Sequence, residues 1–215
     1  MAEALFRQWF VEPCKDGLPE GWKEGTILDY SSHLKSPAKP QDYPHVEFHH
    51  YSIPSFDNNK RALKENGTEI QSGKYYLEKN CILFSKLNPH KDKRIWLLQE
   101  EVEENSICST EFQIIKPKKS NLLYFLYGWL SSQQNYAEIA SGIGGTSGSH
   151  QRIDPATIFT YQCPIVPSKL IDEYNIQAIP LFKKEVINQQ QISALEKLRD
   201  TLLPKLMSGE VRVET

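Results

Sequence analysis

The sequence has little cysteine and no long apolar run. Its four cysteines, Cys14, Cys81, Cys108 and Cys163, are scattered and form no CxxC pair. This pattern argues against a zinc site or a disulfide framework and favours buried free thiols. No apolar run reaches the ~20 residues that a membrane-spanning helix needs, and the start, MAEALFRQWFVEP, lacks the basic-then-apolar order of a secretory signal. We therefore expect a cytoplasmic protein that does not enter a membrane.

A strong charge of either sign is also absent, since 25 lysines and arginines stand against 27 aspartates and glutamates. The charges are nevertheless distributed unevenly along the chain. Residues 31–99 contain 11 basic and 7 acidic side chains, whereas residues 1–30 contain 3 basic and 6 acidic ones. Binding to a polyanion therefore stays open, because the local distribution of charge matters more than its sum.

The most conspicuous motif is the glycine-rich stretch EIASGIGGTSGSHQRID at residues 138–154. A phosphate loop of the nucleotide hydrolases has a lysine directly after its last glycine, and no lysine follows here. A dinucleotide-binding loop needs GxGxxG at the opening of a helix, a spacing that these glycines do not have. Two interpretations stay open: a loop that contacts a different phosphate, and a plain helix C-cap without a ligand.

The hydrophobic pattern of the first half of the chain predicts a helix followed by strands. Residues 2–11 carry apolar side chains at helical spacing, which predicts a short amphipathic helix ending near Pro13. From the turn at residues 17–22 to about Pro117, short apolar or alternating runs are separated by Pro, Gly, Asn and Lys clusters. We read these runs as strands, among them TILDY at residues 26–30.

The pattern after Pro117 is mainly helical. A helix should run from a cap at Asn121 to the glycine cluster. The run ATIFTYQCPIVP, residues 156–167, reads as a short strand. From Ser168 onward the chain consists almost entirely of helix formers.

The last part of this helical region has the seam spacing of a coiled coil. Apolar residues recur at steps of three and four, with Arg199 completing the register: Ile192, Leu195, Leu202 and Leu206. A helix from Pro180 to Met207 would be roughly 40 Å long, and Pro180 either starts or kinks it. The amides at residues 188–191 are expected in the buried seam, where they would set register and partner number. Two alternatives remain: the helix lies on its own β-rich part, or the first helix covers the apolar stripe.

The ending LEKLRDTLLPKLMSGEVRV, residues 195–213, resembles the end of a specificity subunit of a type I restriction-modification enzyme. Other stretches occur in the style and order of that family: LPEGW, ILFSKLNPHKDK, ICSTEFQIIKP, GTSGSHQRI and PIVP. The start ALFRQWFVEP resembles the tail of the family's central helical region. Full members carry two target recognition domains and two long helices, and this chain has one of each. The resemblance therefore implies a half-size subunit.

The fold that the resemblance implies is α+β. A β-rich target recognition domain with a few helices would be followed by a long C-terminal helix that forms an intermolecular coiled coil. The expected parts are a short N-terminal helix (residues 1–13), the recognition domain (14–167), a long helical dimerisation region (168–208) and a tail (209–215).

The function that the resemblance implies is the choice of a DNA sequence. The chain would recognise a bipartite target in double-stranded DNA as a homodimer, and would be the scaffold for modification (M) subunits that methylate adenine and a restriction (R) subunit that cuts. It would do no chemistry itself, so S-adenosylmethionine, ATP and magnesium would be bound only by the partner subunits. The lack of an NPPY- or DPPY-like segment agrees with this. Two alternatives stay open: an antirestriction or decoy half-subunit that binds M subunits without productive DNA recognition, and an enzyme with an unrecognised active site.

Two stretches are candidate DNA contacts. In the glycine-rich loop, the residues suited to contact phosphate oxygens are Gly145, Thr146 and Ser147. The residues suited to contact base edges are His150, Gln151 and Arg152. The second stretch is a basic run after an expected strand: Lys86, His90, Lys91, Lys93 and Arg94. Such a run also occurs as a solvated hairpin tip, which is its alternative.

A metal site at the histidine group His45, His49 and His50 is disfavoured. His49 and His50 face opposite ways on a strand, and no pair of carboxylates completes a ligand set.

Overall fold

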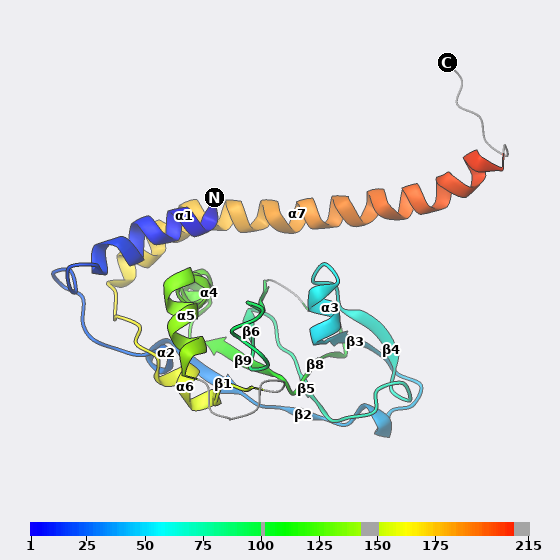
Figure 1. The fold of residues 1–215 in the computed structure, drawn as a ribbon, viewed down its shortest axis with the longest axis horizontal. Coiled ribbons are helices and arrows are strands. Elements are labelled where there is room, and N and C mark those ends of the chain that lie inside the picture. Colours follow the sequence, from blue (N-terminus) through cyan, green and yellow to red (C-terminus); the bar gives the residue numbers. More distant parts are fainter. Residues whose placement is uncertain (100–101, 143–150, 209–215) are drawn as a thin grey trace, which may run out of the picture.

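The computed structural model describes residues 1–99, 102–142 and 151–208. It has a mixed α+β domain, and helix α7 (Ser168–Met207) runs along one side of it (Figure 1). The predicted α+β class, with a β-rich domain and a long C-terminal helix, is confirmed. Within the described ranges no helix is both long and apolar enough to cross a membrane.

Two sheets form the β-rich domain. The first has four strands in the order β1-β9-β6-β7, namely β1 (Ser31–Leu34), β9 (Phe112–Pro117), β6 (Cys81–Ser85) and β7 (Ile95–Leu98). The second has five in the order β2-β5-β8-β3-β4, namely β2 (Pro37–Ala38), β5 (Lys74–Tyr76), β8 (Ser106–Ser109), β3 (Glu47–Tyr51) and β4 (Leu63–Asn66). Neighbouring strands are antiparallel except β3 and β8, which are parallel. The predicted strand-rich stretch up to Pro117 is thus confirmed.

The helices lie before, between and after the strands in the chain. The first is continuous through α1 (Ala2–Phe6), a π-helical turn (Arg7–Val11) and a 3₁₀ turn (Glu12–Cys14), in agreement with the helix predicted to end near Pro13. The others are α2 (Ile27–Tyr30), α3 (Ile53–Asp57), α4 (Leu123–Ser131), α5 (Gln133–Ser141) and α6 (Pro155–Thr160). Short 3₁₀ turns lie at Pro40–Asp42 and Ser120–Leu122.

Two predicted strands are helices, and in both the reason is a capping residue. The TILDY run forms α2, because the Thr26 N–H donates to Asp29 Oδ2 at 2.7 Å in a capping box. The run from Pro155 forms α6, because Asp154 accepts a hydrogen bond from the Ala156 N–H at 2.8 Å and proline occupies the first helical position. Both runs were predicted as strands because they contain β-branched and aromatic residues, which favour strands.

The helix boundaries after Pro117 also differ from the prediction. Asn121 does not cap α4; its side chain donates to Asp172 Oδ1 on α7 at 2.8 Å. The predicted single helix is two helices separated at Ser132. Helix α7 begins at Ser168 and continues through Pro180, so that proline does not start it.

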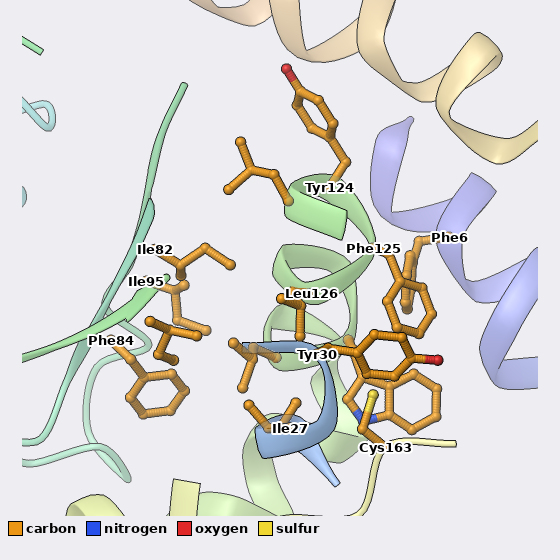
Figure 2. Packing of buried hydrophobic residues seen from close by; sticks show 14 of the residues in the cluster. Phe6, Ile27, Tyr30, Ile82, Phe84, Ile95, Tyr124, Phe125, Leu126 and Cys163 are labelled. Atoms are coloured by element: carbon orange, nitrogen blue, oxygen red, sulfur yellow. The ribbon is translucent and has the colours of Figure 1, made fainter. Parts of the chain in front are cut away.

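The larger hydrophobic core lies between the first sheet, α4 and the first helix. Ile82 and Phe84 of β6 and Ile95 of β7 project from the sheet toward Leu126 of α4, and Phe6 lies on the other side of that helix (Figure 2). A smaller core uses the opposite face of the same strands, with Cys81, Leu83, Trp96, Leu98, Cys108, Phe112 and Ile114. Alternation along each strand therefore supplies both cores.

The first helix is held by aromatic rings. Phe10 is fully buried, and its ring centroid lies 4.9 Å from that of Phe125 on α4 and 5.1 Å from that of Tyr174 on α7. Phe6 lies 5.7 Å from Tyr174 by the same measure. The first helix thus joins the first half of α7 to the β-rich domain.

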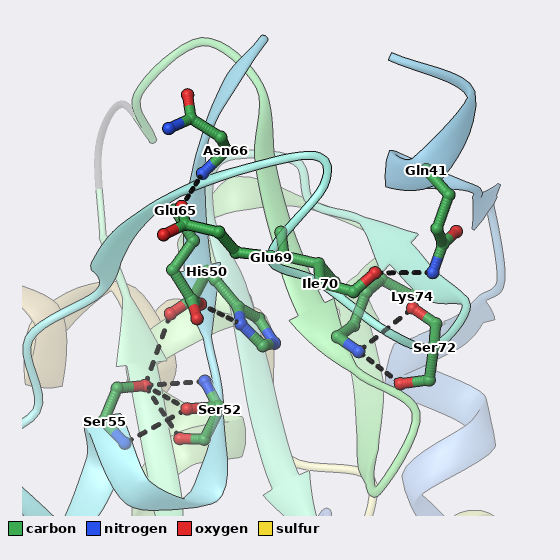
Figure 3. Close-up of polar contacts among 10 residues, drawn as sticks. All are labelled: Gln41, His50, Ser52, Ser55, Glu65, Asn66, Glu69, Ile70, Ser72 and Lys74. Carbon is green, nitrogen blue, oxygen red and sulfur yellow. Dashed lines mark hydrogen bonds and ion pairs between the residues drawn. The ribbon is translucent and has the colours of Figure 1, made fainter. Parts of the chain in front are cut away.

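Polar contacts organise the second sheet (Figure 3). Ser52 and Ser55 form a capping box that starts α3. His50 Nδ1 of β3 lies 2.5 Å from Glu65 Oε2 of β4, and burial lowers the pKa of His50. Among the residues that the structure describes, no group of three His, Cys, Asp or Glu side chains could hold a metal ion.

Gly128 of α4 gives a test of the helix packing. A Cβ at this position would lie 2.2 Å from Cδ2 of Phe6, so Gly128→Ala must displace the first helix and should lower the free energy of unfolding by about 1–3 kcal/mol. The control is Gly73→Ala, whose Cβ meets only the Ala38 carbonyl oxygen at 3.8 Å and should change stability by less than about 1 kcal/mol. Urea unfolding measures both. A Gly128→Ala variant as stable as the unmodified chain would contradict this packing.

Candidate nucleic-acid interface

The structure brings together parts of the two candidate DNA-contact stretches. Residues 86–88, directly after β6, lie beside residues 151–153, and Leu87 pairs with Arg152 in an isolated antiparallel bridge. The Asn88 N–H donates to the Gln151 carbonyl at 2.9 Å, and the Ile153 N–H donates to the Lys86 carbonyl at 3.0 Å. Lys86, Gln151 and Arg152 therefore belong to one region of the surface.

A third segment, the turn between β8 and β9, joins this region. The Lys86 N–H donates to the carbonyl of Glu111 at 2.9 Å. The Arg152 guanidinium makes two parallel bonds to the Glu111 carboxylate, Nε to Oε2 at 3.0 Å and Nη2 to Oε1 at 2.7 Å. Because of this contact, the pKa of Arg152 is raised. The Arg152 side chain is still 54% exposed.

Several cations lie close to each other here. Burial lowers the pKa of Lys86, the charge of Glu111 opposes that shift, and the positive charges of Arg152 and Lys35 add to it. His33 of β1 stacks on Phe159 with ring centroids 5.4 Å apart, and its pKa is lowered by burial and then by Lys35 and Lys86. We call this group the basic surface; its members are His33, Lys35, Lys86, Glu111, Gln151 and Arg152.

Sequence reasoning missed three members of the basic surface: His33, Lys35 and Glu111. His33 and Lys35 lie in the basic segment 31–99, but no local motif marks them. His33 and Lys35 lie near Glu111 because β1 pairs with β9, which begins just after Glu111. Such a pairing between distant segments could not be read from spacing.

The last two residues of the predicted basic run, Lys93 and Arg94, make contacts within the protein. Arg94 Nε lies 2.7 Å from Asp57 Oδ1, and its Nη2 lies 2.8 Å from Asp92 Oδ2, with only 12% of the side chain exposed. Lys93 donates to the Ser131 carbonyl at the end of α4. Arg94 is therefore held against α3 by its two aspartates, whereas Lys93 contacts the end of α4 and is still exposed. His90 and Lys91 are exposed as well.

Four predicted DNA-contact residues, Gly145, Thr146, Ser147 and His150, lie outside the described residues.

The predicted seam of α7 lies on the helix surface. Its apolar residues Ile192, Leu195, Leu202 and Leu206 are 44%, 64%, 37% and 41% exposed. Arg199 pairs with its neighbour Asp200, Nη2 to Oδ1 at 2.7 Å. The first helix packs on the first half of α7 around Tyr174, so the alternative in which it covers the stripe is wrong.

Two of the four amides expected in that seam face another way. Gln189 and Gln190 line a cavity of about 630 Å³ between α7 and the β-rich domain. Farther along the same side, Arg61 Nη1 lies 2.8 Å from Glu196 Oε2. At about 100° per residue, Gln189, Ser193 and Glu196 lie on a different side of the helix from the seam. The expectation that these amides set the register of the seam is therefore wrong for Gln189 and Gln190.

Comparisons with known proteins find type I specificity subunits both by sequence and by structure. The chain is 29% identical over 236 aligned residues to the type I restriction enzyme MjaIX specificity subunit of Methanocaldococcus jannaschii, with 100% of this chain and 53% of that protein covered. The crystal structure of the HsdS subunit from Thermoanaerobacter tengcongensis matches 93% of this chain and 51% of its own, with a TM-score of 0.61 and 17% identity. The type I restriction-modification S subunit from M. genitalium matches 89% and 47%, with a TM-score of 0.57 and 17% identity. No family model matches the chain.

These comparisons confirm the resemblance to type I specificity subunits. The two solved structures show that the fold is shared, and the curated relative shows that sequence similarity runs along the whole chain. The chain spans about half the length of the curated relative that it matches.

The two kinds of arginine in the predicted stretches should differ in their effect on stability. Arg94→Ala removes a largely buried guanidinium from two aspartates and should lower the free energy of unfolding by about 1–2 kcal/mol. Arg152→Ala removes an exposed ion pair and should cost less than about 1 kcal/mol. Urea unfolding compares the two variants. A larger loss for Arg152→Ala would contradict the assignment of Arg94 to internal packing.

Proposed function

We propose that this chain selects the DNA sequence for a type I restriction-modification complex, as a specificity subunit that acts in two copies. The observation that carries the proposal is the agreement between the fold and the covered share of the relative. Similarity covers the whole chain and 53% of the specificity subunit it matches, and the described residues contain one recognition domain followed by one long helix. Two copies would supply the two domains and two helices of a full-size subunit.

The DNA would be contacted through the basic surface and the loop that precedes Gln151. Lys86, Lys35 and Lys91 are suited to phosphate contacts, which attract DNA without reading its sequence. Arg152 and Gln151 have side chains that pair with guanine and adenine edges in the major groove. Gly145, Thr146, Ser147 and His150 remain proposed contacts on the same sequence grounds as before. His90 and Lys93 are exposed and also remain proposed phosphate contacts, whereas Arg94 is engaged by Asp57 and Asp92.

Methylation and cleavage would belong to partner subunits. The chain would be their scaffold and would bind modification (M) subunits and, in the full complex, a restriction (R) subunit. Sites for S-adenosylmethionine, ATP and magnesium would then be carried by those partners and not by this chain.

The exposed seam supports a homodimer. Soluble monomers rarely expose an apolar stripe such as the one formed by Ile192, Leu195, Leu202 and Leu206. A second copy of α7, running antiparallel, would cover it and would place one recognition domain at each end. From Phe182, the last buried residue of α7, to Met207 the helix is roughly 39 Å long, close to one turn of duplex, ~34–36 Å. Because the same residues would read both half-sites, the target would be a palindrome interrupted by a spacer.

Selection from a randomised duplex pool, with the modification subunit present, tests the proposal directly. The expected result is enrichment of one bipartite, interrupted palindrome. Arg152→Ala or Gln151→Ala should weaken binding to that sequence by about 1–3 kcal/mol, because each removes a base contact. The control is Lys64→Ala on the edge strand β4, where Lys64 pairs with Glu47 at 2.8 Å and is 61% exposed. Binding of the partner without enrichment of any sequence would contradict the proposal.

Sedimentation of the isolated chain at micromolar concentration tests the homodimer. The chain should sediment at twice its monomer mass, and Leu195→Asp or Leu202→Asp should convert it to a monomer, because each buries an unpaired charge in the seam. Lys197→Asp is the matched control, since at about 100° per residue it lies opposite the seam. A monomer that still binds its partner and DNA would refute the dimer.

A further inference from the structure

Arg152 is held in a defined orientation by Glu111. A guanidinium has five N–H donors arranged as two forks that share one nitrogen. Glu111 occupies the side fork, with Oε2 on Nε at 3.0 Å and Oε1 on Nη2 at 2.7 Å. The terminal fork, formed by Nη1 and the remaining Nη2 hydrogen, makes no hydrogen bond to any described residue. More than half of the side chain is exposed, so this fork is accessible to a ligand.

We propose that Glu111 is a positioning residue that presents the terminal fork of Arg152 to a guanine edge and keeps phosphate groups away from it. The inference rests on the proposed function in DNA recognition, and it assigns a role to a residue outside the predicted contacts. Guanine presents two acceptors in the major groove, N7 and O6, at the spacing of an arginine fork. A guanidinium with one fork on a carboxylate can bind these neutral acceptors with the other.

The carboxylate acts differently on a phosphate. A DNA phosphate that approached Arg152 would come close to the negative charge of Glu111, and like charges at short range repel each other. A guanine edge carries no net charge, so the repulsion by Glu111 is much smaller there. Glu111 therefore weakens the binding of Arg152 to arbitrary DNA more than its binding to the target, and selectivity gained by weakening the wrong complex is a general strategy.

The backbone around Glu111 supports a fixed position. The Glu111 carbonyl accepts the Lys86 N–H at 2.9 Å, and its own N–H donates to Ser109 Oγ at 3.2 Å. Arg152 is attached to the same region through its bridge with Leu87. Both partners of the ion pair are thus anchored through their main chains, which limits the orientations open to the guanidinium. Lys86 and Lys35 are left to contact phosphates nearby.

The test compares the affinity for the selected target with that for a scrambled duplex of the same length, using the complex with its modification subunit. Glu111→Gln should bind the scrambled duplex several-fold more tightly and should reduce the target-to-scrambled affinity ratio about tenfold. Its salt dependence on scrambled DNA should steepen by about one unit in the log–log slope, as expected for one more phosphate contact. Glu111→Asp, which keeps the charge but shortens the side chain, should leave the scrambled affinity unchanged and weaken target binding.

A double-mutant cycle separates positioning from a merely structural role. In the Arg152→Ala background, Glu111→Gln should no longer change the affinity ratio, because its effect acts through Arg152. Asp57→Asn, which removes a partner of Arg94, is the control and should leave the ratio unchanged.

Two outcomes would overturn the inference while leaving the proposed function intact: an unchanged ratio in Glu111→Gln, or an equal fall in the ratio with and without Arg152. A ratio of one in the unmodified chain would overturn the proposed function together with the inference.

Discussion

The packing of the first helix between α4 and α7 is the constraint on which the rest of the structure depends. Phe10 and Tyr174 are fully buried, and the Phe10 ring contacts those of Tyr174 and Phe125 within one hydrophobic core. Burial of each such ring contributes about 1.5–3 kcal/mol, and contacts between aromatic rings add about 0.5–1.5 kcal/mol per pair. The first helix and the first half of α7 are thereby fixed to the β-rich domain. Beyond Phe182 the described part of α7 has no further buried residue, so the orientation of its second half depends on this packing and on the Arg61–Glu196 ion pair.

The same core continues to the basic surface. Ile82 and Phe84 of β6 pack on α4, and the strand then delivers Lys86 to the surface. The adjacent strand β9 starts just after Glu111 and carries Ile115 into the same core. A displacement of α4 would therefore move Lys86 and Glu111 together. In the proposed dimer, this continuity would keep each DNA-contact surface at a fixed position relative to the seam, which a target with a defined spacer requires.

The parts of the fold that follow from short-range pattern were predictable, and those that depend on distant pairing were not. Alternating runs predicted the strand-rich stretch, and three- and four-residue steps predicted the long helix α7 with its apolar stripe. The helix α6 was missed because ATIF contains strand-forming residues, although Asp154 followed by Pro155 is a helix-start signal. Of the candidate contacts, Lys86 and Arg152 were named from residue type alone. The pairing that brings them together, and the roles of Lys35, Glu111 and Arg94, arise from contacts between segments far apart in sequence.

Amide hydrogen exchange of the complex, with and without its selected duplex, tests the central claim most directly, namely that DNA is read at the basic surface. The account predicts that the duplex slows exchange at residues 86–88, 110–112 and 151–153, which share backbone hydrogen bonds there. Exchange in β4, on the far edge of the second sheet, should not change. Protection confined to β4 and α3, with the three segments of the basic surface unaffected, would contradict the account.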